Sequence, residues 1–255
     1  MDLALETRGL CKHFGELAAV DGIDLEVPRG SFFGFLGPNG AGKSTTIKCL
    51  TGLMQPTAGT FRILGLNPAA DPVAVRRRIG VMPENLALFD RLTGAETLSF
   101  VGQVHGLPAA TVRSRATDLL TLMDLASAAG DMAADYSHGM RKKLALAVAL
   151  LPAPRLLFLD EPFEGIDAVA SRQIRQLLSR FVEGGGTIFL TSHILEIVER
   201  LCDHVAVIHK GRLVAQGLLA DLRAGAGVGR SLEAVFLDLV GAATGPTAGL
   251  DWLAG

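Results

Sequence analysis

Short apolar runs alternate with longer amphipathic stretches along most of the chain. The runs are rich in Val, Ile, Leu and Phe and lack polar alternation, which is typical of strands covered on both faces of a parallel sheet. We expect such strands at residues 32–36, 79–82, 156–159, 187–190 and 205–208. Their alternation with helical patterns predicts an α/β fold in which helices cross over between parallel strands.

Two other patterns complete the predicted core. Residues 23–27 alternate between apolar and acidic side chains, as in a half-exposed strand, and residues 60–64 form a further strand-like run. From about residue 85 to residue 151 the spacing of apolar residues becomes mostly helical, which predicts a helical insertion within the α/β core. Its helices are expected at residues 97–106, 109–125 and 140–151.

The C-terminal part has a different pattern. Glycines at positions 225, 227 and 229 predict a flexible connection, and apolar residues at helical spacing over 232–239 predict a short helix after it. Residues 244–255 are rich in Gly, Ala and Pro, which favours a mobile tail. We therefore expect residues 1–224 to form the core with its insertion (about 85–151), and residues 225–255 to form a C-terminal helix and tail.

The composition fits a folded protein and excludes some functions. Apolar residues make up 49% of the 255 positions and charged residues 20%, so the chain can bury a large core. The 24 basic and 26 acidic residues give a net charge of −2, which argues against a protein that coats nucleic acid. No run reaches the roughly 20 consecutive apolar residues that a membrane-spanning helix needs.

The N-terminus and the cysteines predict a cytosolic chain. The first residues lack the basic and apolar regions of a signal peptide. Cys11, Cys49 and Cys202 are few, odd in number and far apart, which suits a reducing compartment. No Cys or His pair has the usual ligand spacing, so we expect no structural zinc site.

A glycine-rich segment lies between the predicted strand 32–36 and a predicted helix. It fits the phosphate-binding pattern GxxxxGK[ST], and its residues are Gly37, Pro38, Asn39, Gly40, Ala41, Gly42, Lys43, Ser44 and Thr45. In this pattern backbone N–H groups converge on phosphate oxygens, Lys43 reaches the β- and γ-phosphates, and the Ser44 hydroxyl ligates Mg²⁺. A glycine-rich turn that matches by chance is the alternative. The strand before the segment and the helix after it favour nucleotide binding.

Two acidic residues follow the predicted strand 156–159. Asp160 and Glu161 lie at the carboxyl end of a parallel strand, where ligands bind in open α/β sheets. Asp160 is placed to hold Mg²⁺ directly or through water, and Glu161 is placed to polarise the attacking water as a general base. A strand that ends in two solvated acids is the alternative, which the upstream Lys43 and Ser44 disfavour.

Further short motifs occur in a definite order along the chain. Glu84 follows the strand 79–82, Tyr136-Ser137-His138-Gly139-Met140 precedes a helix, Gly165-Ile166-Asp167 comes shortly after Glu161, and Thr191-Ser192-His193 follows a strand. Together with the phosphate loop and the acidic pair, this ordered set resembles the ATP-binding cassette of ABC transporters over residues 3–218. The resemblance implies a P-loop ATPase core with a mostly parallel sheet, an N-terminal antiparallel β-subdomain and a helical insertion.

The resemblance implies roles in the chain's own nucleotide site. Phe14 matches the aromatic residue that stacks on adenine, with an ordinary core phenylalanine as the alternative. His193 matches the switch histidine that contacts the γ-phosphate, and Glu84 stands where the family usually has a glutamine that touches Mg²⁺ and the attacking water. The implied catalytic residues are Lys43, Glu161 and His193, and the implied metal ligands are Ser44, Glu84 and Asp160.

The resemblance also implies a second cassette. Ser137, His138, Gly139 and Met140 match the signature motif, which contacts the γ-phosphate held by the other subunit, and Asp167 matches the aspartate of the loop between subunits. Two chains arranged head to tail would then hold each ATP between the phosphate loop of one and the signature motif of the other. We expect a homodimer that uses ATP and Mg²⁺.

Two positions depart from the family pattern. Glu84 stands in place of glutamine and adds negative charge near the phosphates. Two consequences stay open: Glu84 retains metal binding, or it alters communication with the membrane partner. His138 replaces the second glycine of the signature motif. Extra bulk at a tight turn would narrow the loop, but Ser137 and Gly139 are intact, so the signature site is kept and the effect of His138 stays open. The basic residues 141–143 that follow are expected to be partly exposed.

The resemblance implies a separate integral-membrane permease and a place at the cytoplasmic face of the cell membrane. The permease would dock beside Glu84, where Leu86, Leu88 or Phe89 is expected either to face it or to pack inside the insertion. Residues 231–236 resemble the tail helix of ATPases paired with type-two ABC exporter permeases, which implies export.

Two other functions remain as alternatives, and no nucleic-acid partner is expected. A soluble ABC ATPase acting on ribosomes or DNA typically carries a second cassette, coiled-coil arms or basic extensions, and none is evident in the sequence. A small-molecule kinase with the same phosphate loop would leave residues 137–139 and His193 unexplained.

Overall fold

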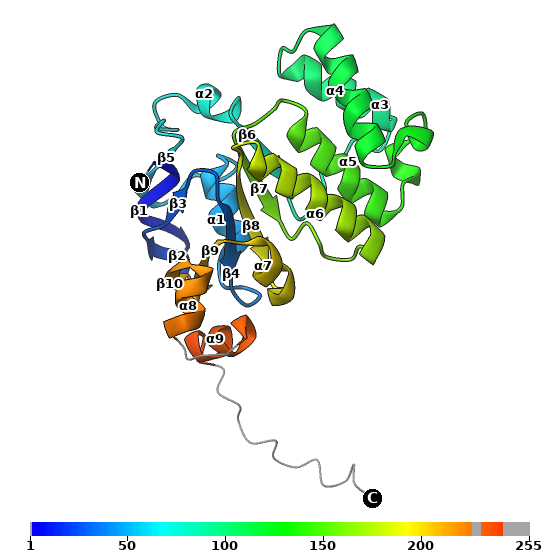
Figure 1. The fold of residues 1–255 in the computed structure, drawn as a ribbon. Helices are drawn as coiled ribbons and strands as arrows, with labels where there is room; N and C mark the ends of the chain where they lie inside the picture. The colour runs from blue at the N-terminus through cyan, green and yellow to red at the C-terminus, as the bar shows by residue number, and fades with distance from the viewer. Residues whose placement is uncertain (1, 226–230, 242–255) are drawn as a thin grey trace, which may run out of the picture.

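The central sheet contains the strands that the apolar runs predict, in the order β10-β9-β4-β8-β7-β6 (Figure 1). The computed structural model describes residues 2–225 and 231–241. The strands are β4 (Phe32–Leu36), β6 (Ile79–Met82), β7 (Leu156–Asp160), β8 (Thr187–Ser192), β9 (His204–His209) and β10 (Arg212–Leu218). All neighbouring pairs are parallel except β9 and β10, which confirms the mostly parallel α/β core.

A second, antiparallel sheet forms at the N-terminus, as the resemblance implied. Its strands are β1 (Leu3–Phe14), β2 (Leu17–Ile23), β3 (Glu26–Pro28) and β5 (Ala58–Ile63), and β1 pairs with the other three. The prediction of a single strand at residues 23–27 was wrong, because β2 ends at Ile23 and β3 begins at Glu26. At the break the buried Thr7 hydroxyl accepts from Leu25 N and donates to Ile23 O, both at 2.8 Å, while Thr7 N donates to Leu25 O at 2.9 Å.

The helical insertion contains α3 (Gly94–Val104), α4 (Ala109–Leu122) and α5 (His138–Leu150), with the short 3₁₀ turns η1 (Ala126–Ala128) and η2 (Ala133–Asp135). In Figure 1 these green helices lie on the far side of the central sheet from the N-terminal sheet. Helix α3 begins three residues before its predicted start because Thr93 and Glu96 form a capping box there. The predicted insertion and its three helices are therefore confirmed, with shifted ends.

The remaining helices surround the central sheet. They are α1 (Lys43–Leu50), α2 (Pro72–Arg76), α6 (Ala168–Glu183), α7 (Leu195–Leu201), α8 (Leu219–Gly225) and α9 (Leu232–Leu239). The C-terminal helix α9 was predicted, and it packs on α7 and α8 with Leu232 and Val235 buried. Residues 226–230 of the predicted connection and the predicted tail 244–255 lie outside the described residues, and the boundary at residue 224 stays a prediction.

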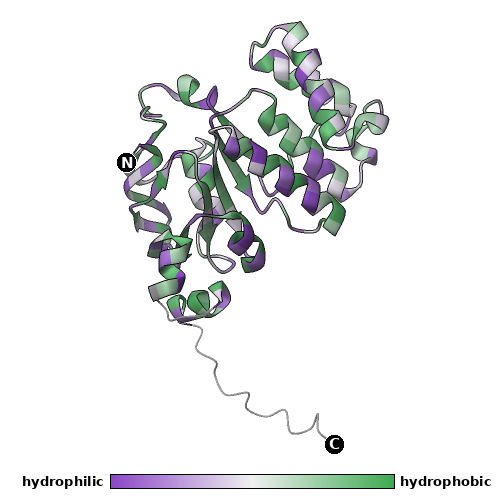
Figure 2. Cartoon of the chain, in the orientation of Figure 1, coloured by the Kyte–Doolittle hydropathy of each residue, from purple (hydrophilic) through white to green (hydrophobic). Residues whose placement is uncertain are grey.

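Neighbouring residues of one strand point into different cores. In β4, Phe33 and Phe35 join a cluster that reaches the N-terminal sheet, whereas Phe32 and Leu36 join a cluster shared with the insertion and α6. Figure 2 shows the resulting concentration of hydrophobic residues in the central strands. Both faces of the sheet are covered, so polar groups gather where β4, β7 and β8 end. Within the described residues, no helix is both long and apolar enough to cross a bilayer.

Candidate functional site

The phosphate loop connects β4 to α1 through a path that only glycine permits at two points. A Cβ on Gly37 would lie 2.4 Å from Ile208 O, and one on Gly42 would lie 2.4 Å from Ala19 O. Gly42 also has a φ of +112° and forms the N-cap of α1 without a side chain. The loop therefore leaves the first backbone N–H groups of α1 open to an anion. Lys43 begins α1, and its Nζ donates to Gly37 O at 2.8 Å.

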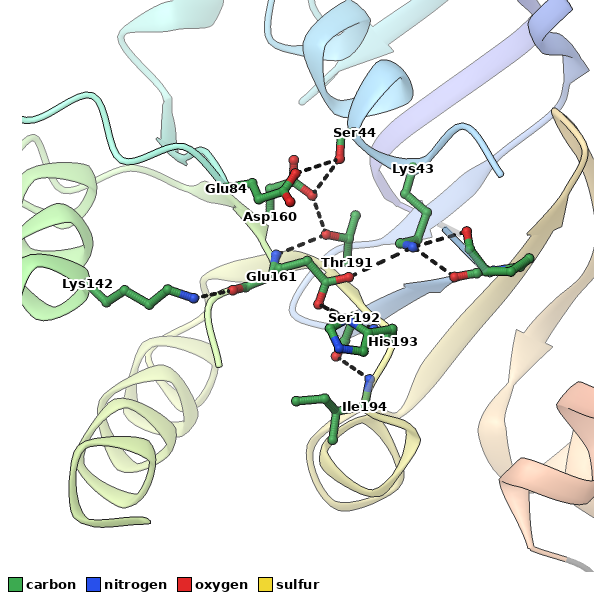
Figure 3. Close-up of polar contacts among 12 residues, drawn as sticks. Lys43, Ser44, Glu84, Lys142, Asp160, Glu161, Thr191, Ser192, His193 and Ile194 are labelled. Carbon is green, nitrogen blue, oxygen red and sulfur yellow. Dashed lines mark hydrogen bonds and ion pairs between the residues drawn. The ribbon is translucent and has the colours of Figure 1, made fainter. Parts of the chain in front are cut away.

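Two carboxylates converge on the Ser44 hydroxyl. Its Oγ lies 3.3 Å from Asp160 Oδ1 and 3.5 Å from Glu84 Oε2, although the three residues come from α1, the end of β7 and the segment after β6 (Figure 3). The single hydroxyl hydrogen is donated to only one of these oxygens at a time, so the carboxylates of Asp160 and Glu84 remain close together as two like charges. A set of one hydroxyl and two carboxylate oxygens fits a hard divalent cation such as Mg²⁺.

Glu161 lies at the centre of the same group and is 6% exposed. Its backbone has a φ of +50°, a left-handed conformation that is uncommon for residues other than glycine. Its Oε1 lies 3.9 Å from Lys43 Nζ, and its Oε2 lies 3.0 Å from His193 Nδ1. The topology explains this meeting, because Lys43, Glu161 and His193 follow β4, β7 and β8, which are adjacent parallel strands.

A cleft of about 490 Å³ opens above these residues. Its wall includes Phe14, Asn39, Ser44, Glu84 and His193, all of which the sequence singled out. The Phe14 ring is 47% exposed at the end of β1, which excludes the alternative of an ordinary core phenylalanine. The Lys12 ammonium lies 5.1 Å from the centre of that ring. A flat, exposed ring at one end of a cleft and a phosphate loop at the other suit a nucleotide.

The signature residues lie elsewhere on the chain. Ser137 is the exposed N-cap of α5, where its Oγ accepts from Met140 N at 3.3 Å. Gly139 lies near Asp167, since a Cβ on the glycine would lie 4.0 Å from the Asp167 carboxylate. Within the described residues, the lining of the 490 Å³ cleft includes neither Asp167 nor residues 137–140. The structure therefore brings the signature motif beside Asp167 and leaves both outside the chain's own cleft.

His138 does not lie in a tight turn. The residue is the first of α5 and is exposed. Its ring lies over Gly165, where an added Cβ would be 3.1 Å from His138 Nε2. The bulk is accommodated because residue 165 has no side chain.

The basic residues after the signature motif are also placed differently from the expectation. Lys142 and Lys143 are buried, with exposed fractions of 3% and 8%, whereas the sequence predicted partial exposure. Lys142 Nζ donates to Glu161 O at 2.7 Å (Figure 3). Arg141 is partly exposed as expected, and it pairs with Asp90 at 2.9 Å. The two buried lysines face the interior because α5 is covered by α3, α4 and α6.

The charged groups beside α5 have shifted pKa values. Asp167 accepts from Ala170 N at 2.8 Å as the N-cap of α6, and this bond lowers the pKa of its carboxyl group. Burial lowers the pKa of Lys142, while the carboxylates of Glu164, Glu161 and Glu84 act in the opposite direction. Asp167 is thereby kept as an anion, and the carboxylates around Lys142 favour its ammonium form.

Sequence reasoning missed four residues of this site. Thr191 accepts from Glu161 N at 3.1 Å, and its own hydroxyl donates to Asp160 Oδ1 at 2.5 Å. Leu17, Ala19 and Glu164 line the cleft. In the motif Thr191-Ser192-His193, sequence reasoning assigned a role only to the histidine. Thr191 could have been found as a hydroxyl residue on a predicted strand that would lie next to the strand ending in Asp160 and Glu161.

Three residues on the N-terminal sheet come together although their spacing predicted no metal site. The candidate ligand atoms of Cys11, His13 and Asp21 all lie within 4.8 Å of one another. Asp21 already accepts from Arg212 Nε at 2.8 Å, and Cys11 Sγ accepts from Gly22 N at 3.1 Å. These bonds account for Asp21 and Cys11 within the sheet, and the expectation of no structural zinc stays a prediction.

Comparison with known proteins gives a consistent result. The family model described as "ABC transporter" matches residues 20–164, and a model for an AAA domain matches residues 131–199. The daunorubicin/doxorubicin resistance ATP-binding protein DrrA of Streptomyces peucetius is 41% identical over 224 residues, which cover 88% of this chain and 68% of the relative. The linearmycin resistance ATP-binding protein LnrL of Bacillus subtilis (strain 168) is 35% identical over 218 residues, which cover 86% of this chain and 70% of the relative.

The same similarity extends to the three-dimensional structure. A solved structure of the ATP-binding subunit of an ABC transporter superposes with a TM-score of 0.87 at 34% identity. The superposition covers 92% of this chain and 99% of the other. The arrangement of the two sheets and the helical insertion is therefore shared with that subunit.

Proposed function

We propose that two copies of this chain act together with a separate membrane permease. The premise is that the chain belongs to the ABC transporter family and is an ATP-binding, ATP-hydrolysing subunit of such a transporter. The observation that carries this proposal is the separation of the site into two parts. Lys43, Ser44 and Glu161 line one cleft, and the signature residue Ser137, the N-cap of α5, is not part of its lining. A second chain supplies the missing part.

Within the cleft, each residue has a role that its contacts support. Phe14 stacks on the adenine, and the open N–H groups of the phosphate loop bind the β- and γ-phosphates with Lys43. Glu161 takes the proton of the attacking water, because its carboxylate is held by Lys43 and His193 toward the cleft. His193 is 45% exposed and able to reach the γ-phosphate. These assignments explain why residues from three separate strand ends meet.

Ser44, Asp160 and Glu84 would hold Mg²⁺. The ion would neutralise the charge that develops on the phosphates. The fit rests on the two carboxylates that converge on one hydroxyl, an arrangement in which a bound cation removes the repulsion. Glu84 thus keeps a metal-binding role although glutamine is usual at its position.

Two copies meet head to tail around a two-fold axis. Ser137 and Gly139 at the N-terminus of α5 would contact the γ-phosphate in the partner's cleft, because a helix N-terminus favours an anion. Asp167, an anion near the signature residues, would lie at the same interface. ATP closes the pair by bridging the chains, and hydrolysis reopens it by removing that bridge.

The permease would dock between the core and the insertion. Leu86 and Leu88 pack against the hydrophobic core, which was one of the two arrangements expected. Phe89 is 48% exposed and meets Phe100 edge to face, with ring centres 5.0 Å apart. An exposed aromatic pair, one member of which follows Glu84 closely in the sequence, suits an apolar segment of a membrane protein at the cytoplasmic face. Phe89, rather than the two leucines, is therefore the proposed contact.

Export is the proposed direction of transport. DrrA and LnrL are both named as ATP-binding proteins of resistance to a compound, and removal of the compound from the cell is one route to resistance. The sequence of the C-terminal helix α9 supports the same subfamily. The permease, which determines the cargo, is a separate chain.

A pull-down tests the proposal. Tagged Glu161→Gln chain is added to gently solubilised native membranes with Mg-ATP, and co-purifying proteins are identified, with ADP and with Lys43→Ala as controls. We expect a multi-span membrane protein in stoichiometric amount only with Glu161→Gln and ATP, because the closed pair is then trapped. Recovery of ribosomal proteins or nucleic acid, or of no membrane protein, would contradict the proposal and favour the soluble ATPase.

A further inference from the structure

Lys142 joins the signature helix to the catalytic strand. It lies in the second turn of α5, whose N-cap is Ser137, and its ammonium group is buried beside the loop after β7. Its Nζ donates to Glu161 O at 2.7 Å across 19 residues of sequence (Figure 3). The carbonyl also accepts from Glu164 N, at the longer distance of 3.3 Å. The lysine therefore makes the shorter bond to this peptide group.

The backbone of Glu161 needs such support. A left-handed conformation is unfavourable for a residue with a side chain, and it persists only where surrounding contacts impose it. The peptide N–H of Glu161 is held by Thr191, and its carboxylate is held by Lys43 and His193. The Lys142 bond fixes the remaining polar group, the carbonyl.

The burial of an ammonium group at this place has an energetic cost. Removing a lysine charge from water is unfavourable unless hydrogen bonds and opposite charges compensate. Here the compensation comes from the Glu161 carbonyl and from the carboxylates of Glu84, Glu161 and Glu164, which favour the charged lysine. The groups that keep Lys142 charged are thus those of the nucleotide cleft.

We propose that Lys142 is a positioning residue that holds Glu161 in the conformation from which its carboxylate faces the cleft. This inference rests on the proposed function, in which Glu161 is the general base and Ser137 binds the ATP of the partner chain. Helix α5 carries both Ser137 and Lys142. When Ser137 docks on the ATP in the partner's cleft, α5 and Lys142 are fixed, and so is the position of Glu161 in the chain's own cleft. One helix would then couple the two sites.

Two substitutions separate the hydrogen bond from simple packing. Lys142→Met keeps a long side chain without a donor, whereas Lys142→Gln keeps a donor without the charge. Arg115→Met is the matched control, because Arg115 NH1 also donates to a backbone carbonyl of α5, Leu151 O at 2.9 Å, at the end of the helix away from the cleft. The full chain is assayed for steady-state hydrolysis, equilibrium binding of Mg-ATP and melting temperature.

We expect Lys142→Met to lower kcat about tenfold or more, because a small displacement of a reacting group is costly, while the Kd for Mg-ATP changes less than about twofold. Lys142→Gln should retain more activity than Lys142→Met, and Arg115→Met should keep kcat near that of the unaltered chain. If Lys142→Met does not fold, Lys142→Leu, which also lacks a donor, replaces it in the comparison with Arg115→Met.

Three results would overturn the inference. Equal kcat values for Lys142→Met and Arg115→Met would show that the bond to Glu161 does not matter for hydrolysis. A parallel loss of ATP binding, melting temperature and kcat would show a purely structural role. Absence of hydrolysis by the unaltered chain would instead overturn the proposed function itself, so the two failures are distinguishable.

Discussion

The nucleotide cleft and the signature motif differ in how completely one chain builds them. Glu161 is buried with Lys43, Asp160 and Thr191, and it bonds to residues that follow or belong to neighbouring strands, so folding alone sets its position. Ser137 is exposed, and its side chain only caps its own helix. The cleft is therefore preorganised, while the signature helix presents its N-terminus outward. In the proposed pair of chains, each chain contributes halves to two different sites, and Lys142 connects the two halves.

The largest expected effect comes from removing the base in the preorganised half. Glu161→Gln keeps the shape of the side chain but loses its basicity, so we expect kcat to fall roughly 100-fold or more while Mg-ATP still binds. Steady-state hydrolysis and equilibrium binding measure the two quantities. Glu164→Gln is the matched control, because Glu164 lines the same cleft. A rate for Glu161→Gln within tenfold of the unaltered chain would contradict the base assignment.

The next effect tests whether the outward half belongs to another chain's site. In the Glu161→Gln background, Ser137→Glu would place a like charge against the partner's γ-phosphate, which costs several kcal/mol. We expect the ATP-induced dimer to disappear in size-exclusion chromatography with light scattering. The Kd of the monomer for Mg-ATP should change less than about twofold, since Ser137 lies outside the chain's own cleft.

The matched variant for that experiment is Lys43→Ala in the same background, which should lose nucleotide binding and, as a consequence, the dimer. The two variants therefore fail at different steps. If Ser137→Glu weakened nucleotide binding by the monomer as strongly as Lys43→Ala does, the separation of the site into two halves would be wrong.

A smaller effect concerns the contact that accommodates His138. Gly165→Ala introduces a side chain at a φ of +67° and places its Cβ 3.1 Å from His138 Nε2. We expect the free energy of unfolding to fall by about 1–2 kcal/mol from the conformation alone, with a further loss from the contact. Gly22→Ala is the control, since its φ is +65° and nothing lies within 4 Å of an added Cβ. Urea unfolding should show Gly165→Ala to be the more destabilising of the two, and equal losses would contradict the contact.

The elements that depend on continuous apolar runs could be predicted from sequence. The runs at β4 and β6 match the observed strands because nothing polar interrupts them. The run at 23–27 did not reveal a break, because the split depends on the Thr7 hydroxyl from another strand. Similarly, the start of α3 depends on a capping box that lies outside the apolar pattern. Local patterns thus predict elements better than they predict ends.

The candidate site was predictable where a motif carries the chemistry itself. Lys43, Asp160 and Glu161 were found because their neighbours in sequence have a recognisable order. Lys142 was expected to be partly exposed, since charged residues are seldom buried, and only the folded chain shows its carbonyl partner. The resemblance implied that the signature motif acts in another chain's site, and the structure supports this by leaving residues 137–140 outside the cleft.

The smallest expected effect tests the charge at Glu84 on the edge of the preorganised half. Glu84→Gln removes an exposed carboxylate 3.5 Å from the Ser44 hydroxyl while Asp160 remains. An exposed charge contributes about 0.2–1 kcal/mol, so the free Mg²⁺ concentration for half-maximal hydrolysis should rise at most about fivefold. Magnesium titrations of hydrolysis at fixed ATP measure this shift, with Glu164→Gln as the control. If the magnesium requirement rises for Glu84→Gln and not for Glu164→Gln, the Glu84 carboxylate contributes to binding of the metal. An unchanged or lower magnesium requirement would contradict that role and leave communication with the permease as the reason for a carboxylate at this position.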